Sequence, residues 1–360
     1  MPRMFDILRG QAPDDKDGNK GRETERNIPL VYPKSPSQNN KSSSCPDDYA
    51  LASRKLIDAV KENGVDNSQA ARKVYDDAVS VISGLLSASK SQEDLSAFAE
   101  RIKAAIDSVY HQLLLGDKIL VNIYKPKLSE YYLPYHIVNT LTLSIATGLS
   151  MKFNKSRIDD LALAAIFSDT GIEEVKDIVI KPRKLTEEEK CWVEAHLSNS
   201  LKFAERVLPL NDNVKEAIQM HHERVNGKGY PRALKQDAIA PYAKIIGLVD
   251  TYEAMTHKRN YLEEMSAHKA IRLLISSLRD AFDTHVLRAF INKMSVYPIG
   301  SLVILESNEI ARVVSVHPGS PLRPIVQIIR DTAGNSLEDG AIIDLSIQDF
   351  PAIQDSFQIV

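Results

Sequence analysis

The sequence predicts a mainly α-helical protein with a small β-rich part at its C-terminal end. Between residue 47 and about residue 294, apolar residues recur every three or four positions, which is typical of helices that bury one face. After Tyr297-Pro298 the pattern changes to short runs of β-branched residues that are separated by turn signals. We therefore expect a helical bundle that is followed by a small β appendage.

The N-terminal part divides into two segments. Residues 1–46 are rich in Asp, Lys, Asn, Ser and Pro, so they cannot bury enough apolar surface to offset the entropy of ordering, and we predict a disordered tail. Residues 47–100 are predicted to form an N-terminal helical segment. Its first helix covers YALASRKLIDAVKENG and ends at Gly64, a second begins near Ser68, and a third follows residue 91.

Residues 101–296 are predicted to form the main helical domain, and residues 297–360 the β-rich appendage. The expected helices of the domain lie at 134–151, 155–170, 186–207, 211–224, 241–256, 265–279 and 283–294. Prolines separate several of them, because a proline inside a helix removes a hydrogen bond and clashes with the preceding turn. In the appendage, SLVILE, IARVVSV, PIVQIIRD and AIIDLSI predict about four strands, with one face packed on the helical domain.

Composition and charge exclude some classes of function. The 45 Lys and Arg residues nearly balance the 48 Asp and Glu residues, giving a net charge of −3, which argues against a DNA- or RNA-binding protein. No stretch is long and apolar enough to span a membrane, and the first residues lack the apolar middle of a secretion signal. The two cysteines, Cys45 and Cys191, do not suggest a disulfide framework. We therefore expect a cytoplasmic location.

The strongest local signal is His221-His222-Glu223, which precedes the run from Asn226 to Pro231, NGKGYP. Successive helical residues point about 100° apart, so the two histidines reach one metal only near the end of a helix, or serve a site from different directions. The glycines permit a tight turn. Taken alone, a His-His pair is more typical of a surface or packing feature than of a pair of ligands.

Other candidate ligands lie on apolar helices. His136 lies in one of them, Asp169 follows LALAAIF, Asp250 follows AKIIGLV, and His196 lies in the helix that begins near Thr186. A buried carboxylate needs a cation or several hydrogen-bond donors. Singly, each of these residues is more typical of a hydrogen-bonded core side chain. Together with the His-His pair they favour a metal site, whose mixed His and Asp ligands suit Fe, Mn, Zn, Ni or Co.

The order of these residues resembles the HD-GYP branch of the HD phosphohydrolases. The matching elements are His136, Asp169-x-Gly171, His196, His221-His222-Glu223, Gly227-x-Gly229-Tyr230-Pro231 and Asp250. KPRKLTEEE, DTYEAMTHKRNY and the start of the β-rich tail also resemble this family, and the resemblance covers residues 100–350 approximately. It implies an all-α HD-type bundle around a metal centre that hydrolyses the bacterial second messenger cyclic di-GMP.

The resemblance also implies roles for individual residues. One ion would be held by His136, Asp169 and Asp250, and a second by Asp169, His196, His221 and His222. Asp169 would be the catalytic residue because it bridges the ions, which would activate water and neutralise charge on the phosphoryl oxygens. Tyr230 and Arg259 would bind the nucleotide. The implied cofactor is one or two divalent transition-metal ions per chain, such as Fe or Mn.

The sequence departs from the family pattern near the first ion. Ser168 stands where the family has the histidine of its name, and a hydroxyl is a poorer ligand than imidazole. Ile172 replaces a lysine that contacts the scissile phosphate, and it offers neither a proton nor a charge. Asn226 replaces an aspartate and Leu262 a basic residue. Tyr132 stands near the position of the glutamate that gives some members a third metal, so we expect none here.

Three functions therefore remain open, and the sequence does not decide whether the protein is an enzyme. The first is a cyclic di-GMP phosphodiesterase with an altered di-metal centre. The second is a catalytically degenerate domain that senses the nucleotide or binds other proteins. The third is an HD-type hydrolase that acts on a different phosphoester, against which the Gly-Tyr-Pro loop argues by resemblance only. The expected partners are cyclic di-GMP, signalling proteins and, as one alternative, a second copy of the chain.

Overall fold

The computed structural model describes residues 66–89, 95–116, 119–123, 132–179, 181, 183, 185–257, 265–317, 320–337, 339–347 and 352–357. Four sequence-based predictions lie outside these residues: the disordered tail 1–46, the helix that ends at Gly64, and the roles considered for Arg259 and Leu262.

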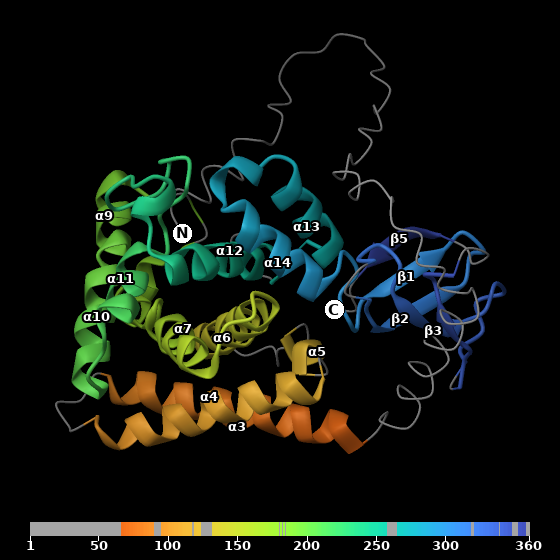
Figure 1. Ribbon diagram of the computed structural model, residues 1–360, viewed down its shortest axis with the longest axis horizontal. Helices are drawn as coiled ribbons and strands as arrows, with labels where there is room; N and C mark the ends of the chain where they lie inside the picture. The colour runs from red at the N-terminus through yellow and green to blue at the C-terminus, as the bar shows by residue number, and fades with distance from the viewer. Residues whose placement is uncertain are drawn as a thin grey trace, which may run out of the picture.

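Helices dominate the part of the chain that the structure describes (Figure 1). They are α3 Asp66–Ala88, α4 Ala97–Leu115, α5 Leu120–Ile123, α6 Leu133–Ser150, α7 Lys155–Phe167, η2 Thr170–Val175, α8 Lys176–Val179, α9 Glu187–Glu194, α10 His196–Val207, α11 Asp212–Met220, η3 Gln236–Ala238, α12 Pro241–Thr256, α13 Ala267–Ile275, η4 Arg279–Ala281 and α14 Thr284–Met294. The predicted mainly α-helical class is confirmed.

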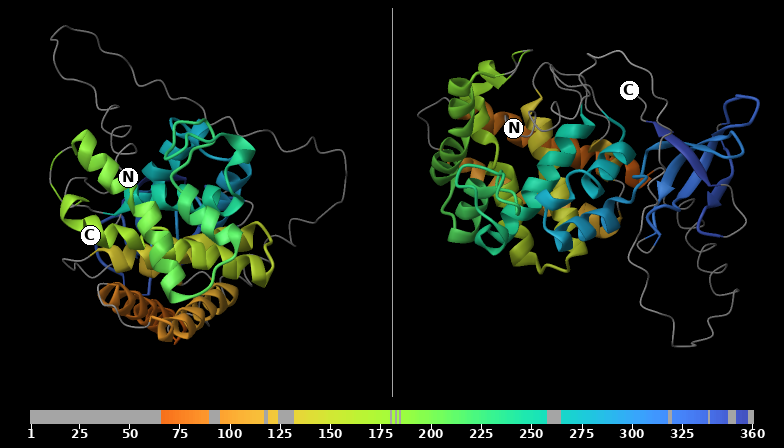
Figure 2. Two further views of the ribbon diagram at one scale, coloured as in Figure 1. Left: turned by 90° about the vertical axis from the view of Figure 1, so that its left-hand side faces the viewer. Right: turned by 90° about the horizontal axis from the view of Figure 1, so that it is seen from above.

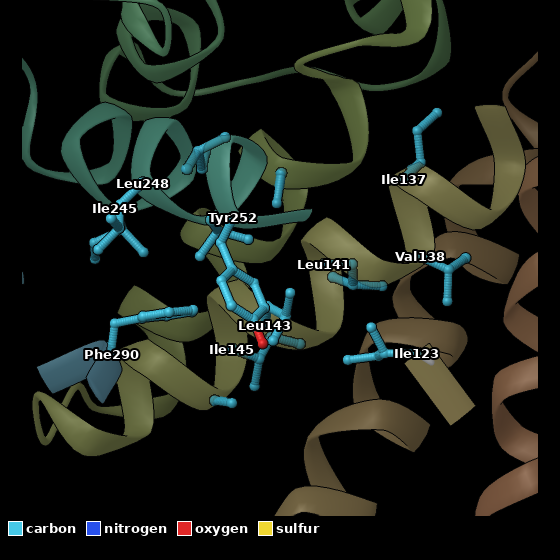
Figure 3. Packing of buried hydrophobic residues seen from close by; sticks show 14 of the residues in the cluster. Ile123, Ile137, Val138, Leu141, Leu143, Ile145, Ile245, Leu248, Tyr252 and Phe290 are labelled. Carbon is cyan, nitrogen blue, oxygen red and sulfur yellow. The ribbon is translucent and has the colours of Figure 1, made fainter. Parts of the chain in front are cut away.

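Helix α6 forms the centre of the bundle. Its residues from Leu133 to Gly148 are almost all buried, which is typical of a helix that other elements cover on every side. Figure 3 shows Tyr252 of α12 pointing toward Leu143 and Ile145 of α6, and the ring of Tyr252 meets Phe290 of α14 edge-on at 5.0 Å between centroids. This packing fixes α6 and α12, which both carry candidate ligands, against one another.

Helices α3 and α4 pack side by side along one flank of the bundle, against α6 (Figures 1 and 2). Helix α3 begins at Asp66, slightly before the start predicted near Ser68, and continues to Ala88. Its buried stripe includes Tyr75 and Ile82, which are at most 1 % exposed. The N-terminal helices therefore contribute to the same hydrophobic core as the main domain.

Polar caps set the starts of the helices whose far ends carry the site. The side chain of Asn154 accepts a hydrogen bond from the Arg157 N–H at the start of α7, and Asn211 does the same at the start of α11. Thr186 and Glu189 form a capping box at the start of α9. Each cap satisfies amide donors that the first turn leaves unpaired, so the register of the helix is fixed from its first residue.

The single helix expected over residues 186–207 is instead two helices, α9 and α10, which meet at Ala195. The Nδ1 atom of His196 donates to the Val193 carbonyl at 2.5 Å. This side-chain bond competes for the carbonyl that a continuous helix would use for its main-chain bond. Residue periodicity alone does not reveal such a break, because both helices keep the same apolar spacing.

The C-terminal residues form an antiparallel sheet with the strand order β4-β3-β2-β1-β5. The strands are β1 Leu302–Leu305, β2 Ile310–Ser315, β3 Ile325–Arg330, β4 Ile342–Asp344 and β5 Ile353–Phe357. Four strands match the expected segments. The sequence did not predict β5, since IQDSF lacks a run of β-branched residues. Buried side chains of the sheet are continuous with the core of the helices. Among the described helices, none has the length and hydropathy of a membrane span.

Candidate metal centre

Six side chains from five segments meet inside the helical domain, and each is at most 2 % exposed. They are His136 on α6, Asp169 after α7, His196 at the start of α10, His221 and His222 after α11, and Asp250 on α12. The six predicted ligands are thus brought together, although up to 114 residues separate them in the chain. The His-His pair lies just past the end of its helix, where both rings can turn toward one site.

The six residues form two groups in which the candidate ligand atoms lie within 4.8 Å of one another. The first group is His136, Asp169 and Asp250, and the second group is Asp169, His196, His221 and His222. In the first group, Nε2 of His136 lies 3.2 Å from Oδ2 of Asp169 and 3.5 Å from Oδ1 of Asp250. In the second group, Oδ1 of Asp169 lies 3.6 Å from Nε2 of His196 and 3.7 Å from Nε2 of His221.

Hydrogen bonds fix which nitrogen of each ring faces the centre. The Nδ1 atoms of His196 and His221 donate to main-chain carbonyls three residues earlier, and a carbonyl can only accept. The Nε2 atoms therefore face Asp169. Burial lowers the pKa of His196 to about 3, so this ring is neutral and its Nε2 is an acceptor at physiological pH. Neutral imidazole is the form that binds a metal.

The centre consequently gathers acceptors that lack donors. Among the described residues, Nε2 of His196 and His221, Oδ1 of Asp169 and both carboxylate oxygens of Asp250 have no hydrogen-bond partner. Burial alone would raise the pKa of Asp169, but the adjacent imidazoles of His136 and His221 hold that pKa well below its usual value. Buried acceptors and anions without partners are costly, and a bound cation removes that cost. The residues thus fit a divalent metal with mixed nitrogen and oxygen ligands.

The two departures nearest the first group do not restore a ligand. The hydroxyl of Ser168 is fully buried and donates to the Ala165 carbonyl at 3.0 Å, so the main chain of α7 occupies it. Ile172 is 6 % exposed and belongs to the hydrophobic core. Neither side chain supplies an imidazole or an ammonium group to the centre.

Glu223 holds the glycine-rich loop over the second group. Its carboxylate accepts from the main-chain N–H of Arg232 at 2.7 Å and from that of Leu234 at 2.9 Å. The ring of Tyr230 stacks on His222, with 4.7 Å between centroids and 25° between planes. Burial raises the pKa of Tyr230 well above its usual value, so its phenol keeps its proton. Sequence reasoning quoted Glu223 within a motif but gave it no role.

We expect Glu223→Ala to loosen this loop without removing a metal ligand. The change leaves the Arg232 and Leu234 amides without their acceptor, and each lost bond to a charged group costs roughly 1.5–3 kcal/mol. Trypsin should then cut after Lys228 or Arg232 at least about tenfold faster, since local opening governs such cleavage. Glu216→Ala on the exposed face of α11 is the control. Equal cleavage rates in both variants would contradict the anchoring role.

Two glycines allow helices to approach the centre closely. A Cβ atom on Gly171 would lie 2.4 Å from the His196 carbonyl oxygen, and one on Gly247 would lie 2.3 Å from the His221 carbonyl oxygen. Gly171 appeared in the motif, whereas sequence reasoning missed Gly247. An isolated glycine in the middle of the apolar run AKIIGLV was the signal, because it marks close backbone approach.

Sequence reasoning also missed residues that orient the ligands. The hydroxyl of Ser200 accepts from the Gly171 N–H at 2.8 Å and donates to the Ser168 carbonyl at 2.9 Å, which ties the turn around Asp169 to α10. Glu253 accepts from Nδ1 of His136 at 2.6 Å. A charged residue in the buried run of α12 was a signal for Glu253. The sequence held no comparable signal for Ser200.

Two family models match the chain. One is described as an HD domain and covers residues 119–286. Residues 119–286 are similar to the HD domain family. The other is described as a KOW domain associated with an HD domain and covers residues 302–359, the part that contains the sheet. The resemblance predicted from the order of histidines and aspartates is confirmed.

Curated proteins to which the chain is similar include two bacterial phosphodiesterases. A cyclic di-GMP phosphodiesterase of Pseudomonas aeruginosa is 31% identical over 224 residues, which are 62% of this chain and 54% of the relative. One from Borreliella burgdorferi is 30% identical over 224 residues, which are 62% of this chain and 57% of the relative. The chain thus spans about half the length of these relatives.

A solved structure supports the HD-type helical fold. An HDG"Y"P protein from Bdellovibrio bacteriovorus matches with a TM-score of 0.52 at 14% sequence identity, and the match covers 68% of this chain and 80% of that one. At this identity the similarity concerns the fold alone. The predicted HD-type helical fold is confirmed.

Proposed function

We propose that this protein hydrolyses the phosphodiester bonds of cyclic di-GMP at a divalent-metal centre. The observation that carries the proposal is the meeting of six buried candidate ligands from five helical segments, five of which have a side-chain nitrogen or oxygen without a hydrogen-bond partner. The relatives from Pseudomonas aeruginosa and Borreliella burgdorferi carry the name cyclic di-GMP phosphodiesterase, which supports the choice of substrate.

The six side chains of the two groups would hold the ions, with Asp169 shared between them. When bound, Fe(II) or Mn(II) supplies Lewis-acid polarisation of the phosphoryl oxygens and lowers the pKa of water at the site. The chain's own residues orient and retain the substrate. Tyr230, whose phenol stays protonated, offers a hydrogen bond from the loop that Glu223 anchors. Arg259, which lies outside the described residues, is proposed to contact the nucleotide through its guanidinium.

Hydrolysis of cyclic di-GMP by anaerobically purified protein tests this function. The protein is loaded with Mn(II) or Fe(II), its metal content is measured, and the linear dinucleotide and GMP are quantified by chromatography. We expect a linear product that chelation abolishes. A panel of other cyclic dinucleotides and nucleoside phosphates separates this reading from hydrolysis of a different phosphoester. Protein that holds metal in both groups yet forms no linear product over many hours would contradict the proposal.

A binding module is the second candidate, and the structure around Ser168 favours it. The Ser168 hydroxyl donates a hydrogen bond to a main-chain carbonyl. The buried Ile172 side chain has no charge to offer to a phosphate. A domain that retains metal and nucleotide but turns over poorly would act as a sensor, with signalling proteins or a second copy of the chain as partners. Titration calorimetry with cyclic di-GMP, alongside the hydrolysis assay, distinguishes binding without turnover from catalysis.

We expect Ser168→His to strengthen metal binding at the first group. The change adds an imidazole beside Asp169, and imidazole is a better ligand for these ions than a hydroxyl. A gain of about tenfold in affinity is the expected scale, by comparison with effects of residues that orient ligands. The larger side chain enters a fully buried position and is expected to cost roughly 1–3 kcal/mol in folding stability. Mn(II) titration of wild type, Ser168→His and Ser168→Ala measures the gain. Equal affinities in the three proteins would mean that Ser168 does not weaken metal binding at the first group.

A further inference from the structure

A buried chain of hydrogen bonds runs from helix α3 to the candidate ligand His136. The hydroxyl of Tyr75 donates to Oδ1 of Asn139 at 2.7 Å. The Nδ2 atom of Asn139 donates to Oε1 of Glu253 at 3.1 Å. The other oxygen of Glu253, Oε2, accepts from Nδ1 of His136 at 2.6 Å. All four side chains are at most 1 % exposed, so water does not compete for these bonds.

Each side chain in this series of hydrogen bonds fixes the orientation of the next. If the Asn139 amide were reversed, its carbonyl oxygen would face the Glu253 carboxylate, and two acceptors would repel each other. The carboxylate can only accept, so Nδ1 of His136 carries the proton and Nε2 presents its lone pair. That atom points at Asp169 and Asp250, the other members of the first group. Burial raises the pKa of Tyr75, which keeps its phenol a donor.

This series of hydrogen bonds spans three helices that are distant in sequence. Tyr75 lies on α3, Asn139 and His136 lie on α6, and Glu253 lies on α12. Residue 75 is also outside the segment that the HD domain model matches, which begins at residue 119. Figure 1 shows α3 on the flank of the bundle, on the far side of α6 from α12. A helix outside the matched domain therefore contacts a candidate ligand through two intermediates.

We propose that Tyr75, Asn139 and Glu253 are positioning residues for a metal ion in the first group, so that α3 forms part of the metal site. A carboxylate that holds the far nitrogen of a histidine ligand fixes the tautomer and raises the basicity of the ring. Here Asn139 holds that carboxylate, and Tyr75 holds Asn139. Because the first group has only three protein ligands, the orientation of His136 contributes a large share of its affinity. A displacement of α3 would therefore weaken the first ion before the second. The inference rests on the metal centre of the proposed function.

Mn(II) binding to metal-free full-length protein tests this inference without any nucleotide. After each addition, the electron paramagnetic resonance signal gives the concentration of free Mn(II), and the difference from the total gives the bound Mn(II). We expect Tyr75→Phe to weaken one class of site about tenfold and Glu253→Gln to weaken it by about tenfold to 100-fold, the range for residues that orient ligands. The other class of site should keep its affinity in both variants. Tyr110→Phe, which removes a phenol from the neighbouring helix α4, is the matched control and should leave both classes unchanged.

Two results would overturn the inference. One is Tyr75→Phe protein with wild-type Mn(II) affinities and a lower unfolding temperature, which would make Tyr75 a purely structural residue. The other is His136→Ala protein that binds Mn(II) with the same affinities as wild type. The hydrogen bonds from Tyr75 would then lead to a residue that is not a ligand. Failure of cyclic di-GMP hydrolysis in protein that shows the expected Mn(II) changes would contradict the proposed function alone.

Discussion

Replacing Asp169 by asparagine should remove metal from both groups and abolish hydrolysis. Asp169 is the residue that the two groups share, and its carboxylate faces His136, His196 and His221. The amide of asparagine carries no charge. It offers one oxygen to the two ions, whereas the carboxylate of Asp169 offers two. Loss of a direct ligand should cost at least the roughly 100-fold in affinity that loss of an orienting residue can cost. The rate should fall at least about 100-fold, which corresponds to about 3 kcal/mol of lost transition-state stabilisation.

Metal analysis and the hydrolysis assay on the same preparation measure both effects. Asp159→Asn on the more exposed part of α7 is the matched control, because it makes the same chemical change away from the centre. It should retain metal and activity. Asp169→Asn protein that keeps a full complement of metal would contradict the bridging role and the assignment of the two groups.

Gly247→Ala should destabilise the protein, although alanine is the better helix former. The new Cβ would lie 2.3 Å from the His221 carbonyl oxygen and 3.0 Å from the Arg224 guanidinium, so α12 and the end of α11 must separate. Overpacking of this kind costs roughly 1–3 kcal/mol. The separation also moves Asp250 away from His222, so metal affinity should fall together with stability.

Gly84→Ala in α3 provides the opposite expectation. Its Cβ would meet the Phe98 ring at 3.5 Å, an ordinary contact. The substitution should therefore stabilise by about 0.5–1 kcal/mol through helix propensity and a less flexible unfolded chain. Urea unfolding midpoints of both variants measure the difference. A Gly247→Ala protein as stable as Gly84→Ala would mean that the helices tolerate a side chain at this contact.

Much of the candidate site could be predicted because its residue types are rare in their surroundings. An aspartate after LALAAIF or AKIIGLV stands out, and the burial of both carboxylates follows from the apolar runs that precede them. The grouping of the ligands came from the family resemblance. Periodicity could not have supplied it, since the distances between Asp169, His196 and His221 depend on how three helix ends pack.

The remaining features depend on contacts between distant parts of the chain. Asn139 and Tyr75 are 64 residues apart, and neither residue type indicates its partner. The break at Ala195 depends on a side-chain bond of His196 that leaves the apolar spacing intact. Strand β5 pairs with β1 through main-chain bonds, so its polar side chains gave little indication of a strand.

The metal content of anaerobically purified, fully folded protein tests the central claim most directly. The claim is that the buried histidines and aspartates form a divalent-metal centre with two adjacent groups. Elemental analysis after loading with Mn(II) or Fe(II) should find one ion for each group, with the ion of the complete second group retained longer during dialysis. Folded protein that retains no divalent ion after loading would contradict the account.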